Sequence, residues 1–392
     1  MPPSLFKDRI PWFAWLFPWG MLAVHLSAFW RTIPQYAFGW LVLPLAAYFL
    51  HRRWQSVPFE PARASWASPV ALVCALLMLP AWMIRTAAPH SYHVSYGMAL
   101  LAAGFTLALL AHGGGWRMAR YMAFPVLFVF CAVPWSRHLE GPLIESLTRM
   151  VTIVTVEALQ LSGVAATRTG NLVSLSTGTL DVAEACSGIR SFQSMIMAAL
   201  ALGELHRFGV TRRIALVGIG AGLALFFNLL RNYLLAVLAH SRGLGAIDTW
   251  HDASGWGIFL ISFYLLHQLS ERMEGGFEPP RREPPALRKF PAWAGPALSV
   301  WFITVVAATE GWYRSHEHNI TETITVEWPR RKNSYRIQPV PPATREFLRC
   351  SSIEIAAWSE ENATQWILSA VRWDPGETST NAAQSHHPEV CL

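Results

Sequence analysis

The sequence predicts an all-α polytopic membrane protein with about 8–9 transmembrane helices and a small β-rich extracytoplasmic C-terminal domain. Of its 392 residues, 53% are hydrophobic and only 14% are charged, which is about half the charged fraction of soluble domains. Long apolar runs recur as far as residue 310, and the segment after them alternates between polar and apolar residues. Lipid is therefore the expected solvent for most of the chain, and membrane lipid is an expected partner.

Each expected transmembrane helix corresponds to an apolar run that has, or nearly has, the ~20 residues needed to cross a bilayer. The runs lie near residues 11–29, 34–50, 69–86, 95–112, 120–136, 189–205, 214–238, 254–270 and 292–310. The first run follows Lys7 and Arg9 but precedes no small-residue cleavage site, so we expect a retained span and not a removed signal peptide. The second run is expected to be a short span or a re-entrant element.

The orientation follows from basic residues, which concentrate in alternate connections. These residues are Lys7, Arg9, Arg52, Arg53, Arg63, Arg117, Arg120, Arg207, Arg212, Arg213, Arg272, Arg281, Arg282, Arg288 and Lys289. The positive-inside rule assigns them to the cytoplasm, and it assigns residues 137–188, 239–253 and those after about 311 to the outside. The net charge of +6 is thus explained by orientation, and no nucleic-acid partner is expected.

The segment 143–165 is apolar but is interrupted by Glu145, Arg149, Glu157 and Gln160. If it crossed the membrane, the alternation of basic loops would break at this point. We therefore expect a helix that lies at the outer membrane interface or packs over a cavity, with Glu157 and Gln160 on its polar face. The Gly-, Thr- and Ser-rich stretch that follows it, 167–181, predicts a short hairpin.

The predicted domain organisation follows the apolar runs and the composition. A transmembrane domain over 1–270 precedes a basic Pro-rich cytoplasmic linker over 271–291. One further span over 292–310 leads to a small extracytoplasmic domain over 311–392. In that last domain, alternation predicts strands at Ile320–Trp328, Ile353–Ile355 and Trp366–Trp373.

A polar island between the apolar runs, Asp181 to Ser191, carries the candidate nucleophile Cys186. Ser187-Gly188 before an apolar run predicts a turn that opens a helix, and the positive end of a helix lowers the pKa of a nearby thiol. Asp181 and Glu184 act against this effect, so a further cation is needed. The alternative is a small buried cysteine with a packing role.

Arg231 is the candidate for that cation, because it lies within the apolar run 225–235. Insertion scales put the cost of such an arginine at about 2.5–3.5 kcal/mol or more, so it needs a partner or a water-filled cavity. Asn228, three residues earlier, shares its helical face. The expected role is stabilisation of a thiolate and then of an oxyanion. The alternative is an arginine that snorkels to the headgroups.

His251, on the outer loop expected before the run from Ser254, is the candidate acid–base residue because imidazole exchanges protons with a thiol near neutral pH. His240 is its competitor. Asp252 is not expected to orient the ring, since adjacent residues on a helix do not face each other. The cysteines show no metal-ligand spacing, and we expect neither a metal nor a cofactor.

These residues together resemble the exosortase/archaeosortase family. The resemblance lies in Glu184-Ala-Cys-Ser-Gly-Ile-Arg-Ser191, in Leu230-Arg231-Asn232 and in His251 before a span. Tyr36–Pro44 is similar to an early "YSHGFLVP"-like stretch of the family, with Ala-Phe in place of Ser-His, and Pro125–Pro134 to its mid-chain segment. The resemblance covers about 11–270 and implies that Cys186, Arg231 and His251 are catalytic. The tail, with Trp373-Asp-Pro-Gly, resembles an exosortase-associated extracytoplasmic domain.

The resemblance implies a membrane-embedded cysteine transpeptidase whose substrates are exported proteins with a C-terminal PEP-CTERM-type sorting signal. Such a signal comprises a short motif, a transmembrane helix and a basic end. The implied location is the cell (inner) membrane, with the active site at the extracytoplasmic face. Two alternatives stay open: a purely hydrolytic intramembrane cysteine protease, and a non-enzymatic transporter or scaffold of envelope polysaccharide export. The transporter predicts internal repeats, and none is visible. The sequence carries no signal for an oligomeric state.

Overall fold

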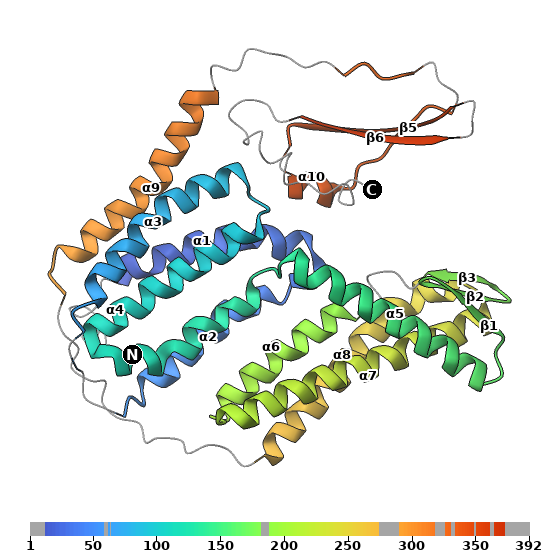
Figure 1. Cartoon of the computed structure of the whole chain (residues 1–392), viewed down its shortest axis with the longest axis horizontal. Helices are drawn as coiled ribbons and strands as arrows, with labels where there is room; N and C mark the ends of the chain where they lie inside the picture. Colours follow the sequence, from blue (N-terminus) through green and yellow to red (C-terminus); the bar gives the residue numbers. More distant parts are fainter. Residues whose placement is uncertain are drawn as a thin grey trace. The chain divides into compact units, whose positions relative to one another are not determined.

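The computed structural model describes residues 12–58, 62, 64–181, 188–273, 290–317, 326–330, 334–348, 350–360 and 364–372 (Figure 1). The chain divides into two compact units, and each is described by itself. The first comprises Met1–Ala46, Leu50–Pro134 and Arg282–Leu392; the second comprises Ala47–Phe49 and Trp135–Arg281.

The first unit is a helical bundle with a small sheet. Its helices are α1 (Trp12–Thr32), η1 (Pro34–Tyr36), α2 (Gly39–Trp54, shared with the second unit), α3 (Ala67–Ala87), α4 (Tyr92–Leu127), η2 (Phe128–Ala132) and α9 (Ala294–Glu317). α4 packs along α1 and α3, and α9 packs along the same two helices. Phe302 of α9 is fully buried; its ring stacks on Phe17 and meets Phe105 edge to face. Aromatic packing therefore connects the first helix of the bundle to the last.

α4 contains a break that its glycines make possible. An unbroken helix of its 36 residues would be about 54 Å long, well beyond the ~30 Å hydrocarbon core. Gly115 has φ 82° and ψ 179°, a conformation that ends the first helical segment. A Cβ at this position would lie 2.8 Å from the carbonyl oxygen of Ala62. The two expected spans 95–112 and 120–136 therefore correspond to helical segments on either side of Gly115.

The second unit contains α5 (Arg137–Leu161), α6 (Ile189–Leu205), α7 (Val210–Arg242) and α8 (Gly245–Arg272). α7 contacts both α6 and α8, and Figure 1 shows the three helices side by side. Their shared core contains Met195, Ala199, Leu216, Ala224 and Leu266. Small residues at the contacts allow close approach of the backbones, as is usual between membrane helices.

The predicted hairpin after α5 is a three-stranded antiparallel meander. Its strands are β1 (Ala166–Thr169), β2 (Leu172–Leu175) and β3 (Gly178–Asp181). Val173 and Leu175 join a hydrophobic cluster with α5 and α7. The Thr177 hydroxyl donates to the carbonyl of Ala239, with 3.1 Å between the oxygens. The meander is thus attached to the C-terminal part of α7, and the chain enters the polar island from there.

The small sheet of the first unit confirms part of the predicted tail. β4 (Arg336–Gln338), β5 (Ser352–Ser359) and β6 (Gln365–Arg372) pair antiparallel in that order. β5 and β6 match two predicted strands, whereas β4 and the helix α10 (Pro342–Leu348) were not expected. Of the predicted strand Ile320–Trp328, residues 326–328 have no strand structure and the rest lies outside the described residues.

Four helices of the described chain are long and apolar enough to cross a membrane: Ala67–Ala87, Tyr92–Ala132, Val210–Arg242 and Ala294–His316. The expected count of eight or nine is not confirmed by this measure. α2 has 16 residues and α6 has 17, below the ~20 of a full crossing. α5 forms as expected and is not among the four candidates. Its place at the membrane interface stays a prediction.

Candidate active site

The candidate site is built around Arg231, whose side chain is buried within α7 at 9% exposure. Gly220, Ala224 and Asn228 precede it at helical spacing, and all are buried. This spacing places Arg231 on the face of α7 that packs against its neighbours. The snorkelling alternative requires an exposed guanidinium, and it disagrees with this burial.

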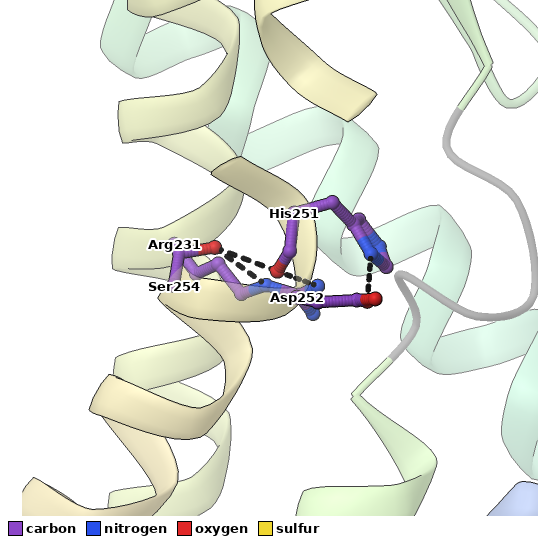
Figure 2. A network of polar contacts seen from close by, with 4 residues as sticks. All are labelled: Arg231, His251, Asp252 and Ser254. Atoms are coloured by element: carbon purple, nitrogen blue, oxygen red, sulfur yellow. Dashed lines mark hydrogen bonds and ion pairs between the residues drawn. The ribbon is translucent and has the colours of Figure 1, made fainter. Parts of the chain in front are cut away.

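The Arg231 guanidinium is held by α8 (Figure 2). Its Nη2 donates to the backbone carbonyl of His251 at 3.0 Å, and its Nε donates to Oγ of Ser254 at 3.3 Å. The same Ser254 hydroxyl donates to the His251 carbonyl at 2.9 Å. Gly255 has no side chain, so the guanidinium packs directly over the α8 backbone at this point. A Cβ on Gly255 would lie 3.5 Å from Cζ of Arg231. The result is a fixed cation in an apolar bundle.

His251 lies within α8, not on the expected loop, because this helix begins at Gly245. Its Nδ1 lies 3.1 Å from Oδ1 of Asp252, so these adjacent side chains do meet, and the geometric argument against Asp252 is wrong. The Asp252 side chain is 93% exposed and can turn along the helix surface towards the ring. Such exposed pairs contribute about 0–1 kcal/mol. Arg231 thus meets the backbone of His251, and the imidazole contacts Asp252.

The competing histidine, His240, has a different neighbour. Its Nδ1 lies 3.3 Å from Oγ of Ser176, in the turn between β2 and β3. Residue 240 also lies nine positions after Arg231, which is about half a turn in rotation on an α-helix. The structure therefore brings His251 to Arg231 and places His240 against the meander.

Cys186 lies outside the described residues, but its neighbour Gly188 is described. Gly188 has φ 84° and directly precedes Ile189, the first residue of α6, which confirms the predicted helix start; Ser187 lies outside the described residues. A Cβ on Gly188 would lie 2.5 Å from Cγ of Asn228. The chain therefore enters α6 in direct contact with the residue three positions before Arg231.

Two polar residues of this unit are not predicted from the sequence as functional residues. Ser254 contacts the Arg231 guanidinium, and the sequence feature that indicates it is a hydroxyl one helical turn after His251. Gln193 is 3% exposed in α6, and its Nε2 donates to Oε1 of Glu140 in α5 at 3.4 Å. The sequence feature that indicates Gln193 is a single amide side chain within the apolar run 189–205.

The described polar groups of this site are hydrogen-bond donors and acceptors. Within the described ranges, no group of three or more His, Cys, Asp or Glu side chains is placed to hold a metal ion. A buried guanidinium is suited to stabilising an anion, which is the chemistry of an acyl-transfer intermediate.

Comparison of the chain with models of protein families identifies its family. The model of the transmembrane exosortase family, Exosortase_EpsH, matches residues 30–267, which is more than half of the chain and includes Gly188, Arg231, His251 and Ser254. Comparisons with curated proteins and with solved structures gave no match. Together with the candidate spans, the match indicates a multi-pass membrane protein. The chain belongs to the transmembrane exosortase family.

Proposed function

We propose that this protein is a cysteine transpeptidase that cleaves C-terminal PEP-CTERM-type sorting signals from exported proteins at the extracytoplasmic face of the cell membrane. Family membership supports the reaction class. The observation that carries the chemistry is the buried Arg231, held against α8 by the His251 carbonyl and Ser254.

Arg231 is suited to stabilise negative charge on a reacting carbonyl. Its position is set before substrate binds, since two of its hydrogen bonds go to α8. Preorganised donors in an apolar site stabilise a developing oxyanion far more than donors in water do. Removal of one such donor typically lowers the rate by about 10²–10³-fold.

Cys186 is the proposed nucleophile, and chain connectivity supports its assignment. It precedes Gly188 by two residues, so the two Cα atoms lie within about 7 Å of each other. Gly188 contacts Asn228, on the same helix as Arg231. The positive end of α6 favours the thiolate form of a thiol that precedes the helix so closely, and Arg231 is the proposed second cation.

In the proposed reaction, the Cys186 thiolate attacks the scissile carbonyl and forms a carbon–sulfur bond. Arg231 stabilises the resulting oxyanion. His251 first takes the proton of the Cys186 thiol, and the carbon–nitrogen bond then breaks as His251 gives this proton to the departing amine. Contact with the Asp252 carboxylate favours the proton on Nδ1, so that Nε2 exchanges protons with the reactants. An acceptor amine or water finally attacks the thioester, gives a proton to His251 and releases the Cys186 thiolate.

The test is co-expression of a sorting-signal substrate with Cys186→Ala, Arg231→Ala and His251→Ala variants, with processing followed on gels. All three are expected to lose processing. His240→Ala and Arg242→Ala are matched controls that should retain it, because these residues lie at the end of α7 away from Arg231. Full processing by Cys186→Ala would exclude the thioester mechanism.

Transfer and hydrolysis are distinguished by the new C-terminus of the released product. Mass spectrometry should show the added mass of an acceptor if the protein is a transpeptidase. A free carboxylate throughout would support the hydrolytic alternative.

A further inference from the structure

Gln193 is a buried amide that the proposed mechanism does not use. Its side chain is 3% exposed, and its Oε1 has no hydrogen-bond partner within the part of the chain that the structure describes. Its Nε2 donates to Oε1 of Glu140 at 3.4 Å. The opposite amide orientation would place two oxygens against each other, so the carbonyl oxygen is directed away from Glu140.

Gln193 and Glu140 together form a pair of acceptors close to the proposed nucleophile. Gln193 lies five residues after Gly188, a rise of about 7.5 Å along α6. Glu140 lies in the first turn of α5 and is partly buried. The pair therefore combines a buried amide oxygen and a carboxylate within one and a half helical turns of the start of α6.

A buried acceptor without a partner is rare in folded proteins, because loss of solvation is not compensated. Such an atom is suited to accept a donor that arrives with a ligand. A sorting-signal substrate would bring such donors, because a transmembrane helix begins after its cleavage motif. The first four N–H groups of that helix have no partner within it, and they carry partial positive charge.

We propose that Gln193 Oε1 and the Glu140 carboxylate accept N–H hydrogen bonds from the first turn of the substrate's transmembrane helix. This contact sets the depth of the substrate helix, and so positions the scissile bond at Cys186. Gln193 is thus a substrate-positioning residue. The inference rests on the proposed function.

The first test is Gln193→Met, which keeps the length of the side chain and removes the amide. Purified protein in lipid nanodiscs is assayed with a peptide that carries the cleavage motif and the transmembrane helix. We expect kcat/KM to fall about tenfold, mainly through a higher KM, as for a lost binding contact. Thermal stability should change little, because loss of the 3.4 Å donor to Glu140 is offset by removal of an unpaired buried oxygen. The rate of Cys186 alkylation by iodoacetamide should stay unchanged. Gln268→Met is the matched control, because it makes the same change near the far end of α8 and should have no effect.

An unchanged kcat/KM in Gln193→Met would overturn the inference. So would a parallel fall in stability and alkylation rate, because that result would indicate a packing role. If Gln193→Met does not fold, a second measurement decides. Gln193→Cys in the Cys186→Ala background should form a disulfide with a substrate cysteine in the first helical turn, and not with one ten residues later. Disulfide formation at both positions, or at neither, would also overturn the inference.

The outcomes separate this inference from the proposed function. Cleavage by Cys186→Ala at the rate of the unmodified protein would refute the proposed function. Loss of cleavage in Cys186→Ala together with an unchanged kcat/KM in Gln193→Met would refute only the positioning role.

Discussion

Substitution of Gly188 by alanine tests the contact that brings the polar island to α7. Gly188 has φ 84°, a left-handed conformation, at the residue before α6 begins. An added Cβ would lie 2.5 Å from Cγ, 2.6 Å from Nδ2 and 3.0 Å from Cβ of Asn228. Most of this overlap is with the amide group of Asn228, a side chain that is 3% exposed and has little space to turn away. We therefore expect Gly188→Ala to destabilise the second unit.

The magnitude has two parts. Left-handed conformation of a residue with a Cβ costs about 1–2 kcal/mol. Overpacking of a close contact adds about 1–3 kcal/mol. The single variant should therefore lose about 2–5 kcal/mol of unfolding free energy. In an Asn228→Ala background the steric part should largely disappear, while the conformational part remains.

The assay is a double-mutant cycle with Gly188→Ala and Asn228→Ala, measured by thermal or denaturant-induced unfolding in detergent micelles. We expect an interaction free energy of about 1–3 kcal/mol between the two sites, because they are in direct contact. Processing of a sorting-signal substrate is measured in parallel, since a shift of the α6 N-terminus also moves Cys186. Equal destabilisation by Gly188→Ala in both backgrounds would refute the contact.

Two further predictions concern buried polar groups. Glu204→Met should lower the unfolding free energy by about 3–5 kcal/mol, because Arg213 then loses a 2.6 Å ion pair in which the glutamate side chain is 3% exposed. Thr106→Val should cost about 2–6 kcal/mol at ~1–3 per unpaired donor, since Trp15 and Trp19 both donate to its Oγ1 at 2.9 Å. Both changes are measured by thermal unfolding in detergent.

Each of these predictions has a matched control within the chain. Glu145→Met removes a pair in which both side chains are more than 60% exposed, and it should cost about 0–1 kcal/mol. Thr309→Val removes a buried hydroxyl that donates only within its own helix, to the carbonyl of Val305. If Glu145→Met lost as much unfolding free energy as Glu204→Met, burial of the ion pair would not explain the loss. If Thr309→Val lost as much as Thr106→Val, the two tryptophan donors would not explain it.

Much of the fold could be predicted because apolar length and turn residues are local signals. The runs 189–205, 214–238 and 254–270 correspond to α6, α7 and α8. Helix ends were less accurate: α8 begins nine residues before the expected run, so that His251 is helical. Polar residues at the start of α8 concealed this extension, because a hydropathy pattern measures apolar length and not backbone conformation.

The candidate site was predictable in its residue types but not in its contacts. A buried arginine within an apolar run demands a partner, and this requirement singled out Arg231. Ser254 and the backbone carbonyl of His251 were not foreseen as that partner. A backbone carbonyl has no sequence signature, and Ser254 lies 23 positions from Arg231 in the sequence.

The sequence by itself determined a helical membrane protein, the start of α6 and the presence of a cation that needs a partner, because composition and neighbouring residues control these properties. Only the tertiary structure decided that His251 and not His240 lies beside Arg231. It also decided that Gly188 contacts Asn228 and that Gln193 is buried with an unmatched oxygen. The physical reason is that these contacts depend on the relative rotation of packed helices, and that rotation is set by side-chain packing along their whole length.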